Sequence, residues 1–220
     1  MNVELETLEV ATGDAPEASI IWLHGLGADG NDFAPIVPQL RLPCDVRFVF
    51  PHAPIRAVTI NNGVRMRAWY DVLSLERTDI EDESGIRDSA SAVAALIDAE
   101  RTRGIASTRI FVAGFSQGGA IALHQGLRHP ERLAGILALS TYLPLGWTLD
   151  EERHSVNEGI PIFMAHGALD NVLPMSLGEV SRDALAQRGY NVEWQSYPMP
   201  HSVCPEEIAD IGRWFTERLS

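Results

Sequence analysis

Basic residues are scarce in this chain of 220 residues, which has 17 Lys and Arg against 30 Asp and Glu and a formal net charge of −13. Nucleic acids and anionic lipid surfaces are bound through clustered Lys and Arg. The charge balance therefore argues against nucleic acid as a partner and against electrostatic docking on a membrane. The acidity itself is expected to serve solubility.

Cysteine is also rare, and long apolar runs are absent. Only Cys44 and Cys204 are present, and their spacing fits neither a zinc site nor a disulfide framework. Two free thiols are expected, with a single disulfide as the alternative. No stretch approaches the ~18 consecutive apolar residues of a membrane span. The N-terminus has neither the basic start nor the apolar run of a secretory signal, so we predict a soluble, cytoplasmic protein without integral membrane association.

The sequence does contain an alternation of short apolar runs with helical patterns. The runs are rich in Val, Ile, Phe and Leu, and most lack polar alternation, which is typical of strands buried on both faces. The six predicted strands cover residues 19–24, 45–50, 109–113, 135–140, 161–166 and 192–197. The main predicted helices cover residues 86–103, 117–128, 174–188 and 205–219. We therefore expect residues 1–220 to form a single α/β domain with a mostly parallel central sheet and helices on both faces.

Residues 51–85 interrupt this alternation. Asn61-Asn62-Gly63 is a turn signal between residues 57–60 and 64–69, so a hairpin is expected there. The acidic stretch 76–83 is predicted to be a solvated loop, with a lid or a partner-binding patch as the alternative. Because loops on a rigid sheet carry specificity, this insertion is expected to form a wall of the functional site.

Ser116 lies in Gly114-Phe115-Ser116-Gln117-Gly118, which matches the G-x-S-x-G motif. The match alone is weak, but here the motif joins a predicted strand directly to a predicted helix, as a nucleophile elbow requires. In an elbow the flanking glycines relieve crowding, and the helix N-terminus favours developing negative charge. We predict that Ser116 is a nucleophile. The alternative is a glycine-rich turn that carries an ordinary serine.

A serine hydroxyl needs a base to take its proton, and His201 is the best placed histidine. It follows the last predicted strand, at the end of a sheet where α/β active sites assemble. Asp170 follows the preceding strand and is predicted to orient the imidazole, which gives the chain order Ser, Asp, His of elbow-type hydrolases. The alternative for Asp170 is a helix cap or turn residue. His166 is expected to be structural and His154 to be solvated.

Acyl transfer also needs hydrogen-bond donors aimed at an oxyanion. The backbone N–H of Gln117, the residue after the nucleophile, is the first expected donor. Leu26 is the second, because Gly25 and Gly27 let the loop after the first predicted strand turn its amides inward; the alternative is a simple glycine turn. His24 is expected to be a hydrogen-bonded structural residue beside the site. No His-x-x-x-His or comparable cluster indicates a metal, so neither metal nor cofactor is expected.

With these residues placed, the sequence resembles the small bacterial carboxylesterases related to acyl-protein thioesterases and lysophospholipases, which have the α/β-hydrolase fold. The motifs that carry the resemblance cover residues 22–30, 51–54, 69–71, 81–85, 114–119, 139–144 and 199–201. The resemblance implies a compact hydrolase without a large cap domain. It also implies a triad of Ser116, Asp170 and His201, with Leu26 and Gln117 as the oxyanion donors.

The resemblance further implies hydrolysis of carboxylic esters or thioesters without a cofactor, and often a homodimer. We predict a serine carboxylesterase that cleaves short- to medium-chain esters through an acyl-enzyme. The acyl chain would lie near Leu73 and Tyr142, with simple packing roles for both as the alternative. Acyl-protein thioesterase or lysophospholipase activity on the same triad is the alternative activity. A non-catalytic hydrolase-like binding protein is the least favoured alternative, because it would lack a triad residue and none is missing here.

Overall fold

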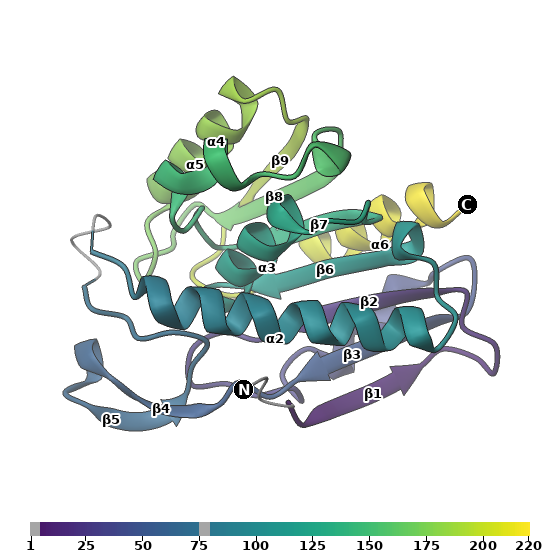
Figure 1. The fold of residues 1–220 in the computed structure, drawn as a ribbon, viewed down its shortest axis with the longest axis horizontal. Coiled ribbons are helices and arrows are strands. Elements are labelled where there is room, and N and C mark those ends of the chain that lie inside the picture. Colours follow the sequence, from purple (N-terminus) through teal and green to yellow (C-terminus); the bar gives the residue numbers. More distant parts are fainter. Residues whose placement is uncertain (1–4, 75–79) are drawn as a thin grey trace.

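The computed structural model describes residues 5–74 and 80–220. A seven-stranded sheet forms its centre, in the order β1-β3-β2-β6-β7-β8-β9 (Figure 1). The strands are β1 (Thr7–Ala11), β2 (Ala18–Leu23), β3 (Val46–Pro51), β6 (Ile110–Phe115), β7 (Gly135–Leu139), β8 (Ile162–Gly167) and β9 (Val192–Tyr197). β1 runs antiparallel to β3, and the other neighbouring pairs are parallel. The prediction of a mostly parallel sheet is confirmed.

The six predicted strands match β2, β3, β6, β7, β8 and β9, each shifted by no more than two residues at either end. β2, β7 and β8 are buried along their whole length, which explains why they read as continuous apolar runs. The structure adds β1, which the sequence analysis did not predict. β1 lies at the sheet edge and has no fully buried residue, so its hydrophobic signal is weak.

Helices cover both faces of the sheet (Figure 1). They are α1 (Val37–Leu40), α2 (Glu83–Thr102), α3 (Gln117–Arg128), α4 (Leu149–Glu152), α5 (Met175–Gln187) and α6 (Pro205–Leu219). On one face, Val93 of α2, Ile121 of α3 and Leu185 of α5 belong to one buried cluster. On the other face, Leu40 of α1 and Phe215 of α6 belong to a second. The sheet is thus sandwiched between two apolar cores, as predicted for an α/β domain.

The interruption at residues 51–85 contains the expected hairpin, formed by β4 (Ile55–Val58) and β5 (Val64–Arg67). Its turn includes Asn62 and Gly63, both with positive φ. Residues 75–79 of the acidic stretch lie outside the described residues. Of the remainder, Glu81 accepts a hydrogen bond from the backbone N–H of Leu145 at 2.9 Å, and Asp82 caps the N-terminus of α2. These two carboxylates stabilise the fold, so a purely solvated loop is the wrong description for them.

Both cysteines are free thiols, as expected. Within the described ranges, no helix combines the length and the apolar character needed to cross a membrane.

Candidate active site

Ser116 occupies the sharp turn between the end of β6 and the start of α3. Its backbone has φ 53° and ψ −121°, a strained conformation for a residue other than glycine. The turn forces close contacts. A Cβ on Gly114 would lie 2.3 Å from the carbonyl carbon of Gly118, and a Cβ on Gly118 would lie 2.3 Å from the carbonyl oxygen of Leu23. Packing therefore requires both motif glycines, and the resulting turn presents Ser116 at the end of the sheet.

Three side chains from separate loops form one hydrogen-bonded chain. The Nε2 of His201 lies 2.9 Å from the Oγ of Ser116, and its Nδ1 lies 2.5 Å from the Oδ2 of Asp170. Asp170 follows β8 and His201 follows β9, and both strands run parallel to β6. Parallel strands end at the same edge of a sheet, so residues 31 and 85 positions apart in sequence meet there. The structure thus brings the three predicted residues together.

The carboxylate of Asp170 is held on both of its oxygens. Oδ1 accepts hydrogen bonds from the backbone N–H groups of Val172 at 2.9 Å and Leu173 at 2.8 Å, while Oδ2 faces His201. Asp170 was predicted to orient His201 or, alternatively, to be a cap or turn residue. The two predictions are compatible, because one oxygen accepts hydrogen bonds within the turn and the other contacts the imidazole. A carboxylate can only accept, so the proton of His201 resides on Nδ1. The lone pair of Nε2 then points to Ser116.

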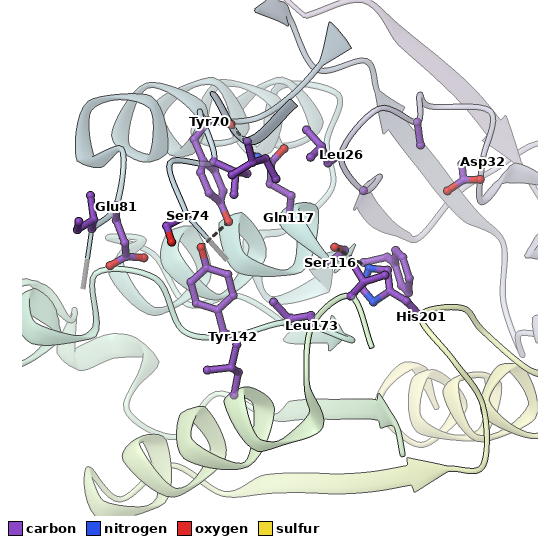
Figure 2. A pocket seen from close by; sticks show the side chains of 18 residues that line it. Leu26, Asp32, Tyr70, Ser74, Glu81, Ser116, Gln117, Tyr142, Leu173 and His201 are labelled. Carbon is purple, nitrogen blue, oxygen red and sulfur yellow. Dashed lines mark hydrogen bonds between the residues drawn. The ribbon is translucent and has the colours of Figure 1, made fainter. Parts of the chain in front are cut away.

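Leu26 and Gln117, the two predicted oxyanion donors, line the same pocket as Ser116. Gln117 is the first residue of α3, and the first N–H groups of a helix have no partner within it. Leu26 follows β2, which pairs directly with β6, and Gly27 beside it has a φ of +77°. Both residues line the pocket in front of Ser116 (Figure 2). The role of their backbone N–H groups as oxyanion donors stays a prediction.

The side chain of Gln117 has a second role that the sequence analysis missed. Its Oε1 accepts a hydrogen bond from the backbone N–H of Trp69 at 2.8 Å, and its Nε2 donates to the carbonyl oxygen of Tyr70 at 2.7 Å. Gln117 is 5% exposed, so both bonds are shielded from water. The bonds fasten the end of the hairpin insertion to the first turn of α3. The motif at residues 69–71 marks this segment in the sequence. Gln117, to which it is hydrogen-bonded, lies 48 residues further along the chain from Trp69, so the contact could not be predicted.

Two buried histidines support the site. His24 is hydrogen-bonded through both ring nitrogens to backbone groups, in agreement with its expected structural role. The Nε2 of His166 lies 2.8 Å from the carbonyl oxygen of Leu173 and 3.5 Å from Oδ2 of Asp170. Burial lowers the pKa of both imidazoles, so both are neutral near pH 7. A neutral His166 donates its Nε2 proton to Leu173 and holds the loop that carries Asp170.

A pocket of about 280 Å³ opens in front of Ser116 (Figure 2). Nine of the 18 described residues that line it have apolar side chains: Leu26, Ala28, Ile60, Val72, Ile80, Phe115, Val172, Leu173 and Leu177. Tyr142, one of the two substrate-contact candidates, also lines the pocket. Leu73, the other candidate, is 38% exposed and is not among the described residues that line the pocket, whereas its neighbours Val72 and Ser74 line it.

The fold is that of the α/β hydrolases, and the protein is a serine hydrolase. More particularly, the chain belongs to the phospholipase/carboxylesterase family, whose model matches residues 5–218. It is 42% identical to acyl-protein thioesterase 1 of Neurospora crassa, over 92% of this chain and 87% of that protein. It is 37% identical to acyl-protein thioesterase 1 of Cryptococcus neoformans, over the full length of both.

Solved structures agree with this assignment. Arabidopsis thaliana SOBER1 superposes with a TM-score of 0.87 at 32% identity, over 92% of this chain and 99% of that one. Zea mays acyl-protein thioesterase 2 gives a TM-score of 0.87 at 31% identity, over 98% and 99%. The family predicted from the motifs is confirmed, whereas a bacterial origin stays a prediction.

Proposed function

We propose that this protein is a serine carboxylesterase that cleaves short- to medium-chain carboxylic esters through Ser116, His201 and Asp170. One observation carries the proposal: the hydrogen-bonded chain from Asp170 through His201 to Ser116 ends in an apolar pocket. Apolar walls suit an acyl chain, and the hydrogen-bonded chain suits proton transfer from the serine hydroxyl.

In the first half of the proposed reaction, the Oγ of Ser116 attacks the ester carbonyl carbon while Nε2 of His201 takes the hydroxyl proton. Asp170 holds the ring and stabilises the imidazolium that forms. The carbonyl oxygen becomes an oxyanion and accepts hydrogen bonds from the backbone N–H groups of Leu26 and Gln117. The tetrahedral intermediate then collapses. The alcohol leaves with the proton from His201, and the acyl group remains on Ser116.

In the second half, water replaces the alcohol. His201 takes a proton from the water as its oxygen attacks the acyl carbon, and the same two N–H groups stabilise the second oxyanion. Collapse of this intermediate releases the carboxylic acid and returns the proton from His201 to Ser116. The residues supply every proton transfer, so the proposed reaction uses no cofactor.

Thioester hydrolysis is the second candidate, and the names of the relatives favour it. Both fungal relatives are acyl-protein thioesterases. The same triad serves a thiol leaving group, because the oxyanion forms at the same carbonyl. Lysophospholipid hydrolysis is a further ester reaction of the same kind.

Matched substrates test these proposals. Oxygen esters and thioesters with two to sixteen acyl carbons are compared on the wild-type protein, Ser116→Ala and the control Ser91→Ala, which alters an exposed serine on α2. We expect Ser116→Ala alone to abolish turnover while its circular dichroism spectrum is unchanged. A preference for short oxygen esters supports the carboxylesterase, and a preference for long thioesters supports the alternative. Turnover retained in pure Ser116→Ala protein contradicts the mechanism.

We further propose that the protein acts on small ester or acyl substrates in the cytoplasm and forms a homodimer. The resemblance supports the dimer, and the two free thiols suit a reducing compartment. Sedimentation equilibrium tests the first, and fractionation of cells tests the second.

A further inference from the structure

Two tyrosines meet across the pocket. Tyr70 follows the β4–β5 hairpin, Tyr142 follows β7, and their hydroxyl oxygens are 2.9 Å apart. Figure 2 shows the two rings reaching toward each other, with Ser116 on one side of the pair and Glu81 on the other. All four residues line the same pocket. In this view the pair lies between Ser116 and Glu81, in the wall of the pocket that all four residues share, and we call it the crossbar.

Both ends of the crossbar are fastened to the site. The carbonyl oxygen of Tyr70 accepts the hydrogen bond from Gln117 described above, at 2.7 Å. Beside Tyr142, the hydroxyl of Thr141 donates to the carbonyl oxygen of Ser116 at 2.7 Å. On its other side, the backbone N–H of Leu143 donates to the hydroxyl of a serine on α5 at 2.8 Å. Because the backbone is held at each end, the two rings have little freedom to move apart.

Breaking the hydrogen bond between the two hydroxyl groups is also unfavourable. Burial raises the pKa of Tyr142 to about 12 and raises that of Tyr70, so both stay protonated and hydrogen-bonded over the physiological range. Separating them against an acyl chain leaves two buried hydroxyls facing methylene groups, and a buried polar group without a partner is destabilising. A short acyl chain stops before the crossbar and avoids this penalty.

We propose that the Tyr70–Tyr142 crossbar limits the acyl length that the pocket accepts. This inference rests on the proposed ester hydrolysis. Short acyl chains occupy the part of the pocket next to Ser116, between Leu26 and Leu173. Longer chains reach the part that borders Ile80 and Glu81 only when the crossbar opens.

The test compares acyl lengths in variants of the two tyrosines. The measured quantity is kcat/KM for a twelve-carbon ester divided by kcat/KM for a four-carbon ester. Tyr142→Phe and Tyr70→Phe each remove one hydroxyl and keep the ring. We expect each to raise the ratio roughly tenfold, which corresponds to about 1.4 kcal/mol. The double Phe variant should exceed either single variant by little, because the first change already breaks the shared bond. Tyr142→Ala should raise the ratio further, since the ring is gone.

Tyr190→Phe is the matched control. Tyr190 is a buried tyrosine outside the pocket lining, so its change should leave the ratio within twofold of wild type. Ratios within twofold of wild type in both Phe variants and in Tyr142→Ala overturn the crossbar. Additive Phe effects also overturn it, because independent effects do not come from one shared hydrogen bond.

Binding measurements separate this inference from the proposed function. If the wild-type protein shows no Ser116-dependent turnover, the proposed esterase activity is rejected. The crossbar is then tested by calorimetric measurement of the affinities for fatty acids of four and twelve carbons. Tyr142→Ala should bind the longer acid about tenfold more tightly relative to the shorter one than wild type does. An unchanged relative affinity overturns the inference whether or not the protein hydrolyses esters.

Discussion

Replacing Gln117 by Met removes the fastening between the hairpin insertion and α3 while keeping the side-chain volume. The backbone N–H of Trp69 and the carbonyl oxygen of Tyr70 then lose their partners in a buried region. Each unsatisfied buried group costs about 1–3 kcal/mol. The two groups together cost about 2–6 kcal/mol, out of about 5–15 kcal/mol for a typical domain. Because one kcal/mol shifts Tm by about 2–4 °C in a domain of this size, we expect Tm to fall by roughly 4–24 °C.

The assay is urea unfolding followed by tryptophan fluorescence and circular dichroism, beside the control Gln187→Met. Gln187 is an exposed residue of α5, so its change should leave the unfolding free energy within about 0.5 kcal/mol of wild type. Met at position 117 keeps its backbone N–H, so kcat should fall less than in variants of the proposed triad. An unfolding free energy for Gln117→Met within about 0.5 kcal/mol of wild type would refute the reasoning.

Asp170→Asn should lower kcat by about 10³–10⁴, because an amide that donates to His201 favours the wrong tautomer; a loss below tenfold in the ester assay argues against this role. Burial raises the pKa of Glu207 from 4.5 to about 8, so the unfolded chain ionises first as pH rises and wild type loses stability between those values. Glu207→Gln does not titrate and should be the more stable protein at pH 8 by about 1–4 kcal/mol, with no difference at pH 4; parallel pH profiles in urea unfolding would exclude this titration. Gly118→Ala places a Cβ 2.3 Å from a backbone oxygen of β2 and should cost about 3 kcal/mol, whereas Gly159→Ala meets open space and should cost less than about 1 kcal/mol. Equal unfolding midpoints for the two glycine variants would contradict the close packing of the elbow.

The parallel core could be predicted from the sequence because most of its strands have a dense run of apolar residues. β2 and β8 are buried on both faces, so their apolar residues are contiguous. β1 was missed because its residues are at best half-buried and its place in the sheet depends on pairing with β3, far along the chain. The acidic stretch was read as solvated because its charges are visible in sequence, whereas the amide that pairs with Glu81 belongs to a loop 64 residues away.

Which residues can perform acyl transfer, and in what order they occur, is already evident from the amino-acid sequence. Ser116 and Asp170 follow strongly apolar strands, His201 follows the more polar β9, and parallel strands bring such positions to one edge. The construction of the surrounding pocket depends on tertiary contacts. The hydrogen bonds of the Gln117 side chain and the Tyr70–Tyr142 pair join segments that are distant in sequence. A single hydrogen bond between distant segments produces no periodic pattern in the sequence, so it cannot be predicted from local sequence patterns.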